Sequence, residues 1–242
     1  MALVLAASVC FSDTQYHEFE GISEAYNIRN LRVLAQLLPE NPVIIEAGAY
    51  KGRDTLKLAQ KFPAGRIYAF EPLRTAFPHL CEAMRPFSNV AVINQALDVT
   101  AGKKDFYICY GTWGQNPIFE FHSSLLKPFG VFAINLIGPT EKVSCTTLFD
   151  FCQENNIEKI DMLWLSTEGS ESQILAGSQE LLDQVSLVFV HTQLHCTRES
   201  MVLFHDLKTY MERNGFILLS HFYIPGAHGD ALFINAKKFI KR

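Results

Sequence analysis

The sequence predicts an α/β fold in which helices cover both faces of a doubly wound, mostly parallel sheet. Three observations indicate this fold. Short apolar runs typical of buried strands recur along the chain, segments with helical periodicity lie between them, and glycine or proline marks the breaks. Because parallel neighbours need a crossover, usually a helix, this alternation favours a parallel sheet.

The expected elements follow one another from residue 28 onward. Helical periodicity covers residues 28–38, 55–62, 75–84, 147–155, 171–182 and 200–214. Strand-like runs cover residues 43–45, 66–70, 90–93, 104–110, 160–165, 186–190, 216–220 and 231–234. Pro39, Pro86 and Gly215 stand where helices are expected to end.

The chain is expected to form one domain over residues 28–242, preceded by an amino-terminal arm over residues 1–27. No change of composition, internal repeat or linker divides it. Residues 111–140 hold four glycines and three prolines, which predicts a long irregular loop. Loops of that length in compact domains are commonly lids or binding loops.

Composition excludes several classes of protein. The 242 residues are 48% hydrophobic and 19% charged, as in globular chains, and the net charge of −4 comes without a basic block, so we expect no nucleic-acid partner. The six cysteines form no C-x-x-C pair and are expected to be reduced apolar fillers, with no metal site. The apolar amino end is too short to span a bilayer, which predicts no membrane partner and a cytoplasmic location.

The first buried strand leads into a turn that contains glycine. Residues 43–52 read VIIEAGAYKG, in which Glu46 closes the strand and Gly48 and Gly52 stand four positions apart. Glycine lets the backbone approach a ligand, and a helix start offers free N–H groups. The third glycine of the dinucleotide fingerprint and the Lys-Ser/Thr of a P-loop are both missing, which disfavours NAD and nucleoside triphosphates. A plain strand-to-helix turn remains the alternative.

A second acidic residue ends the next strand. Residues 68–72 read YAFEP, and Glu71 lies 19 residues after Gly52. At this spacing a carboxylate can accept hydrogen bonds from both hydroxyls of a ribose. The glycine turn alone could be a plain turn, and Glu71 alone could be a surface residue at a strand end. Together they indicate a nucleoside-containing ligand.

These two motifs resemble the FkbM-like family of S-adenosylmethionine-dependent methyltransferases. Further motifs in the expected order support the resemblance: NQAL at 94–97, SSL at 123–125, VSCTTL at 143–148 and DMLWLSTEGSE at 161–171. The resemblance implies a seven-stranded Rossmann-like sheet whose last strand is antiparallel. It also implies S-adenosylmethionine as cofactor and O-methylation of a hydroxyl on a sugar or small-molecule metabolite. It leaves the acceptor unnamed and allows a homo-oligomer.

The resemblance also implies the site residues. Seven of them would contact the cofactor: Glu46, Gly48 and Gly52 at its methionine part, Glu71 at the ribose, Gln95 and Ala96 at the adenine, and Ser124 near the reaction centre. Glu168 and Gly169 fall in a later motif that also faces the reaction centre.

The reaction side departs from the family pattern. Where the family has Lys-Ile-Asp-x-Glu-Gly, residues 164–169 read WLSTEG, and Gln193 stands where the following strand usually ends in Glu. Glu168, His191 and His195 lie near the carboxyl ends of strands, where ligands bind in such sheets. Among them His195 is our first candidate for the proton transfer and Glu168 the second. A structural histidine and a helix-entry carboxylate are the alternatives to these roles.

Two other functions stay open on the sequence alone. The departures at Trp164, Ser166 and Gln193 fit a non-catalytic binding or scaffold protein that retains the fold. A nicotinamide oxidoreductase is the third hypothesis, and the missing fingerprint glycine weighs against it.

Overall fold

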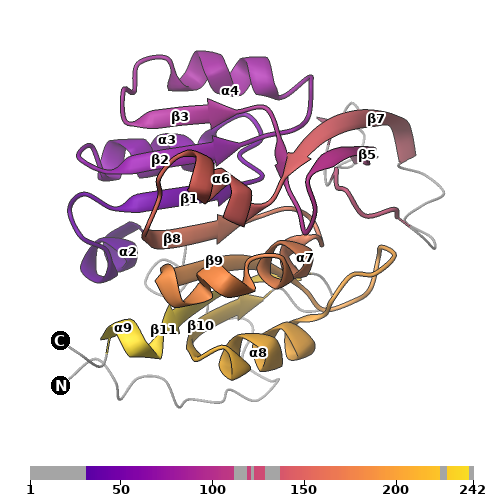
Figure 1. Cartoon of the computed structure of the whole chain (residues 1–242). Coiled ribbons are helices and arrows are strands. Elements are labelled where there is room, and N and C mark those ends of the chain that lie inside the picture. The colour runs from indigo at the N-terminus through magenta and orange to yellow at the C-terminus, as the bar shows by residue number, and fades with distance from the viewer. Residues whose placement is uncertain (1–30, 112–118, 121–122, 129–136, 224–227, 240–242) are drawn as a thin grey trace, which may run out of the picture.

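The computed structural model describes residues 31–111, 119–120, 123–128, 137–223 and 228–239. Three parts of the chain lie outside these ranges: the expected arm over residues 1–27, much of the expected loop, and residues 224–227 between the last two expected strands. Figure 1 shows a central sheet with helices packed on either side.

Seven strands form the central sheet. They are β1 (Val43–Ala47), β2 (Arg66–Phe70), β3 (Val90–Ile93), β8 (Ile160–Leu165), β9 (Val185–Gln193), β10 (Phe216–Tyr223) and β11 (His228–Asn235). Their order in the sheet is β10-β11-β9-β8-β1-β2-β3. The strands from β9 to β3 pair in parallel, whereas β11 runs antiparallel to both of its neighbours. The predicted doubly wound, seven-stranded sheet with an antiparallel last strand is therefore confirmed.

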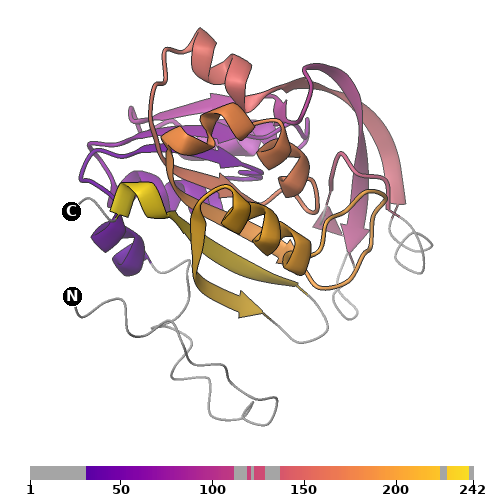
Figure 2. The ribbon, with the colours of Figure 1, turned by 60° about the horizontal axis from the view of Figure 1, so that its bottom comes forward.

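Helices cover both faces of this sheet (Figure 2). On one face lie α2 (Leu31–Leu37), α3 (Arg53–Lys61) and α4 (Phe77–Met84). On the other lie α6 (Leu148–Glu154), α7 (Glu171–Ala176), the 3₁₀ helix η2 (Gln179–Gln184) and α8 (Phe204–Arg213). The short helix α9 (Ala236–Phe239) follows β11. Crossovers on both faces explain why the strands are apolar on both sides.

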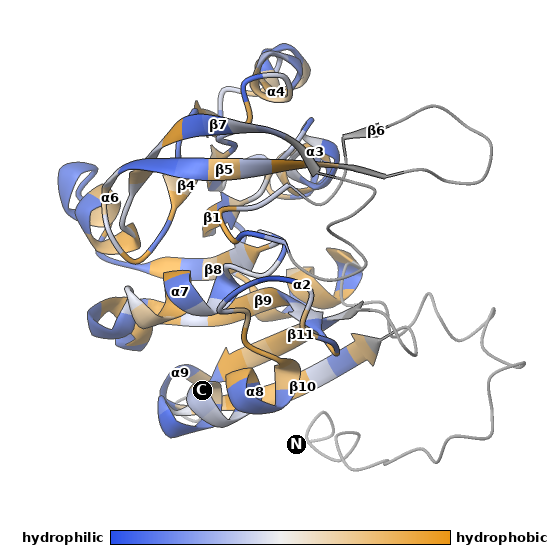
Figure 3. Cartoon of the chain, turned by 90° about the vertical axis from the view of Figure 1, so that its right-hand side faces the viewer, coloured by the Kyte–Doolittle hydropathy of each residue, from blue (hydrophilic) through white to orange (hydrophobic). Residues whose placement is uncertain are grey.

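The core lies where the central strands meet the two helix layers, and Figure 3 shows the apolar colour concentrated along these strands. All six residues of β8 are buried. Trp164 of β8 stacks on Phe189 of β9 with ring centroids 3.9 Å apart. Burying each such aromatic side chain contributes roughly 1.5–3 kcal/mol. The packing makes the strand ends a rigid support for whatever their tips carry.

A second, smaller sheet packs beside the carboxyl ends of the central strands. Its strands are β4 (Ala96–Leu97), β5 (Gly102–Gly111), β6 (Phe119–Glu120) and β7 (Ile137–Thr146), in the order β4-β7-β5-β6. The predicted strand over residues 104–110 lies within β5. The irregular loop expected over residues 111–140 is shorter than predicted, because β6 interrupts it and β7 already begins at Ile137. In the second half of β7, Val143 and Cys145 are buried while Lys142 and Ser144 are exposed, and this short alternation was a missed signal.

The described cysteines Cys81, Cys109, Cys145, Cys152 and Cys196 are free thiols. Burial raises the pKa of Cys145 and of Cys152 to about 11, and both behave as apolar fillers. In the described ranges, no helix has the length and apolar character needed to cross a membrane.

Candidate functional site

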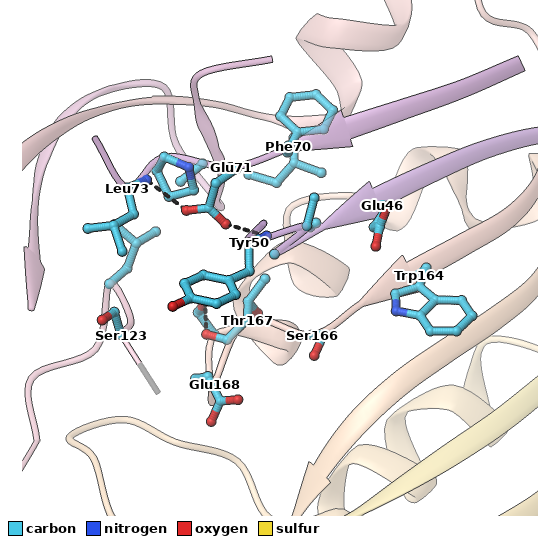
Figure 4. A pocket seen from close by; sticks show the side chains of 18 of the residues that line it. Glu46, Tyr50, Phe70, Glu71, Leu73, Ser123, Trp164, Ser166, Thr167 and Glu168 are labelled. Atoms are coloured by element: carbon cyan, nitrogen blue, oxygen red, sulfur yellow. Dashed lines mark hydrogen bonds between the residues drawn. The ribbon is translucent and has the colours of Figure 1, made fainter. Parts of the chain in front are cut away.

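A cavity of about 570 Å³ opens where β1, β2 and β8 end. This is the edge of an open α/β sheet at which ligands bind, and the volume lies in the usual range for small-molecule sites. Figure 4 shows side chains around it from these strand ends, from the turns that follow them and, at Ser123, from the segment 123–128. Among the seven residues predicted to contact the cofactor, five line the cavity: Glu46, Gly48, Glu71, Gln95 and Ala96. Glu168 lines it as well.

The turn after β1 ties the three strand ends together. The backbone N–H groups of Gly48 and Ala49 both donate to the carbonyl of Phe70, each at 3.0 Å, and Ser166 N donates to Ala47 O at 3.0 Å. Gly48 has a φ of +86°, and a Cβ at this position would lie 2.0 Å from the carbonyl oxygen of Ser166. Only glycine fits here, so the turn can touch the end of β8.

Glu71 holds a fixed orientation at the end of β2. One carboxylate oxygen accepts a hydrogen bond from Tyr50 N and the other from Leu73 N, both at 2.7 Å (Figure 4). The side chain is only 4% exposed. Each carboxylate oxygen can accept more than one hydrogen bond, so acceptor capacity toward the cavity remains. The Tyr50 backbone has a φ of +50°, which is uncommon for a residue with a side chain.

Glu46 is buried at the end of β1, where its carboxylate accepts a hydrogen bond from the Thr55 hydroxyl at 2.7 Å. Gly52, by contrast, is not part of the cavity lining. It precedes α3 with a φ of +87°, and a Cβ there would lie 2.9 Å from Leu80 Cδ1 on α4. Gly52 therefore serves the close packing of two helices.

The second sheet forms one wall of the cavity. Phe106 of β5 lines it together with Ser123 and Leu125 from the segment 123–128. Ser124 is buried behind this wall, outside the lining. Its hydroxyl donates to Thr167 O and accepts from Leu126 N, both at 3.2 Å. Ser124 thereby ties the wall to the turn after β8.

The turn after β8 presents Glu168 to the cavity. Glu168 and Gly169 have φ values of +57° and +112°, so two successive residues lie in the left-handed region. The buried carboxylate of Glu171 accepts hydrogen bonds from Thr167 N at 2.8 Å and from Gly169 N at 2.9 Å. Burial raises the Glu171 pKa above its ordinary value, against the lowering effects of His191 and of the backbone hydrogen bonds.

His191, near the end of β9, also lines the cavity. It lies opposite Asp230 in the register of β9 and β11, with His191 Nδ1 and Asp230 Oδ1 3.0 Å apart. Burial by itself lowers the His191 pKa, but the hydrogen bond to Asp230 and the charges of Glu168 and Glu171 outweigh it and raise the pKa to about 9. His191 is therefore protonated at neutral pH.

His195, our first candidate from the sequence, lies in the exposed segment after β9 and is not part of the cavity lining. Gln193 is the last residue of β9 and is half-buried. A sequence signal for His191 existed: it is the first strongly polar side chain after a run of mostly buried residues in β9. Its partner Asp230 lies 39 residues later, so their pairing depends on the sheet register.

Comparisons with known proteins agree with this architecture. A family model described as "Methyltransferase FkbM domain" matches residues 46–218. The chain is 25% identical over 210 residues to the 2-O-methyltransferase NoeI of Sinorhizobium fredii, covering 85% of this chain and 84% of that protein. It is 27% identical over 189 residues to Methyltransferase 1 of Beauveria bassiana, covering 74% and 73%. Among solved structures, the fibrillarin/Nop5p complex matches with a TM-score of 0.51 at 15% identity, covering 82% of this chain and 74% of that one, a likeness of fold alone.

Proposed function

The chain belongs to the FkbM family of methyltransferases, and from this membership we propose that it methylates a hydroxyl group of a sugar or another small molecule. Methyltransferases of this family depend on S-adenosylmethionine, which supplies an electrophilic methyl group bound to a sulfonium sulfur. Oxygen as the accepting atom is supported by the name of the relative from Sinorhizobium fredii, a 2-O-methyltransferase. The observation that carries the proposal is that Glu71, after β2, and Glu168, after β8, line one cavity from either side of β1.

The residues of the cavity fit this cofactor. Glu71 would hold the ribose, because its fixed carboxylate keeps acceptor capacity toward two neighbouring hydroxyls. Leu73, Ala96 and Phe106 supply the apolar lining that an adenine ring requires. Glu46, a carboxylate buried at the end of β1, would attract the positively charged amino-acid end.

We call the part of the cavity that Glu46, Glu71 and the apolar residues line the cofactor half, and the remainder, where the hydroxyl substrate would bind, the acceptor half. The acceptor half is polar. Ser123, Thr167, Glu168 and His191 line it. Methyl transfer is an in-line displacement in which the protein contributes mainly orientation. We assign Glu168 as the base that takes the proton of the acceptor hydroxyl, a role worth roughly 10²–10⁴-fold in rate. His191 carries a proton at neutral pH and is a poor base there, so its role is to orient or to stabilise negative charge.

Binding and turnover test the proposal separately. Calorimetric titration with S-adenosylmethionine and with S-adenosylhomocysteine is expected to give one site per chain. Incubation with S-adenosylmethionine and a panel of methyl glycosides, read by mass spectrometry, is expected to give products 14 mass units heavier, the mass that one added CH₂ contributes. Absence of binding overturns the cofactor assignment. Binding without transfer to any hydroxyl favours the non-catalytic hypothesis.

A further inference from the structure

The turn that carries Glu168 is held by a carboxylate that does not line the cavity. One carboxylate oxygen of Glu171 accepts a hydrogen bond from Thr167 N and the other from Gly169 N, the two amides that flank Glu168. A left-handed backbone at a residue with a side chain persists only where its surroundings impose it. Glu171 supplies that constraint from within the molecule.

We propose that Glu171, backed by the His191–Asp230 pair, is a positioning residue that presents the Glu168 carboxylate to the acceptor hydroxyl. The inference rests on the proposed function for the role of Glu168. It goes beyond that function because it assigns the buried Glu171 and His191 and the partly buried Asp230 to one task.

The geometry requires Glu171 to be ionised. Each of its oxygens accepts a backbone N–H within 2.9 Å, whereas a protonated acid would place a hydrogen on one of these oxygens. The carboxylate is 4% exposed, so water cannot stabilise its charge. A nearby cation must therefore do so.

His191 supplies such a charge, since it and Glu171 favour each other's charged forms. The buried Arg198 also packs against this turn, with its Cδ 3.4 Å from the position that a Cβ of Gly169 would take. The charged groups that act on the His191 ring are Asp230 on β11, Glu168 on the turn after β8 and Glu171 at the start of α7, and together they hold the proton on His191. The charge of Asp230 also raises the pKa of His221 on β10, but burial outweighs it and lowers that pKa to about 4, so His221 stays neutral. Asp230 thus fixes the ring through Nδ1, and the ring charge compensates Glu171.

This arrangement sets an upper pH limit for the turn. Above about pH 9 His191 loses its proton, and Glu171 is left as a buried charge without that compensation. Burying an uncompensated carboxylate is costly, so the arrangement in which Glu171 holds the two amides loses stability. Glu168 loses its fixed place as a consequence.

A nuclear magnetic resonance titration of the full chain tests the coupling without any acceptor. The probes are the His191 ring and the Thr167 and Gly169 amides, followed from pH 6.5 to 10. We expect the ring and both amides to share one midpoint near 9 in the wild type, and to move together to lower pH in Asp230→Asn. The proposal is overturned if the amide shifts do not follow the titration of the His191 ring. It is also overturned if Asp230→Asn does not change the midpoint.

Kinetics test the positioning role once an acceptor is found. Glu171→Gln keeps the shape but turns an amide NH₂ toward one of the two N–H groups. We expect kcat to fall roughly 10- to 100-fold while the Kd of S-adenosylhomocysteine stays within about twofold. Glu171→Asp retains the charge and is expected to recover part of kcat, and Glu180→Gln, an exposed carboxylate change, is the matched control.

The outcomes separate the two proposals. If the His191 ring and the two amides titrate together but the protein methylates no hydroxyl, the proposed function is removed. The interaction of Asp230, His191 and Glu171 then still stands. An unchanged kcat in folded Glu171→Gln, or a fall that the Glu180→Gln control reproduces, refutes the positioning role. If Glu171→Gln fails to fold, the Asp230→Asn titration decides alone.

Discussion

At the scale of single residues, Glu71 offers the most direct test of the cofactor half. Replacing Glu71 by Ala removes hydrogen bonds from a charged acceptor to the ligand. The expected loss is about 1–3 kcal/mol, which weakens the Kd of S-adenosylhomocysteine by roughly 5- to 150-fold. Calorimetry on folded protein measures it, with the exposed change Glu82→Ala as control. An unchanged Kd in Glu71→Ala would reject Glu71 as the ribose ligand.

Gly48 tests whether the strand ends touch as described. Gly48→Ala adds a Cβ 2.0 Å from Ser166 O at a positive φ, so both overpacking and backbone strain apply. We expect the free energy of unfolding to fall by about 2–4 kcal/mol in urea denaturation. Gly102→Ala is the control, because its φ is also positive at +126° but no atom lies within 4 Å of the added Cβ. Equal losses in the two variants would contradict the close approach.

At the scale of elements, the pairing of β9 with β11 predicts a pH dependence of stability. The folded pKa of His191 is raised from 6.5 to about 9, so its contribution is complete below pH 6.5 and is lost as the pH rises through 9. The resulting decrease in the free energy of unfolding is on the order of 3 kcal/mol. The raised pKa of Glu171 acts in the same direction, whereas the lowered pKa of His221 matters only on the acid side.

Urea denaturation of the wild type at pH 6.5, 8 and 9.5 measures this slope. His191→Gln is expected to be less stable at pH 6.5 and to show a flatter decline. The same decline in both proteins would mean that His191 is not the group that titrates.

Element positions were predictable where periodicity is strong. The strands over residues 66–70, 90–93 and 160–165 were predicted to the residue, because buried parallel strands are short apolar runs bounded by breaks. β7 was not predicted at all, because it begins beside Gly138 and Pro139, Pro139 and Thr140 are both exposed, and this stretch resembles a loop. Helix 171–182 was predicted as one element but divides into α7 and η2 at Gly177, whose Cβ would lie 2.8 Å from the backbone of Val99.

At the scale of the whole molecule, the sequence located the cofactor half of the cavity better than the acceptor half. Glu46, Gly48 and Glu71 sit on local strand-to-helix turns, whose form follows from nearby residues. His191, Asp230 and Glu171 come together only through sheet register and a crossover, which no local pattern encodes. The sequence therefore pointed to His195, which the fold leaves exposed, four residues beyond His191.

Hydrogen exchange tests whether the two acidic strand ends serve one ligand. A single adenosyl ligand in the cavity should slow exchange together in the turn after β1, the turn after β2 and residues 95–97, because each segment lines the same space. At a free concentration of 100 times its Kd, S-adenosylhomocysteine should also raise the free energy of unfolding by about 2.7 kcal/mol. Helix α8 and strand β10 lie outside the lining and serve as internal controls. Protection confined to one of the two turns, or spread equally to α8, would mean that Glu46 and Glu71 do not share a ligand.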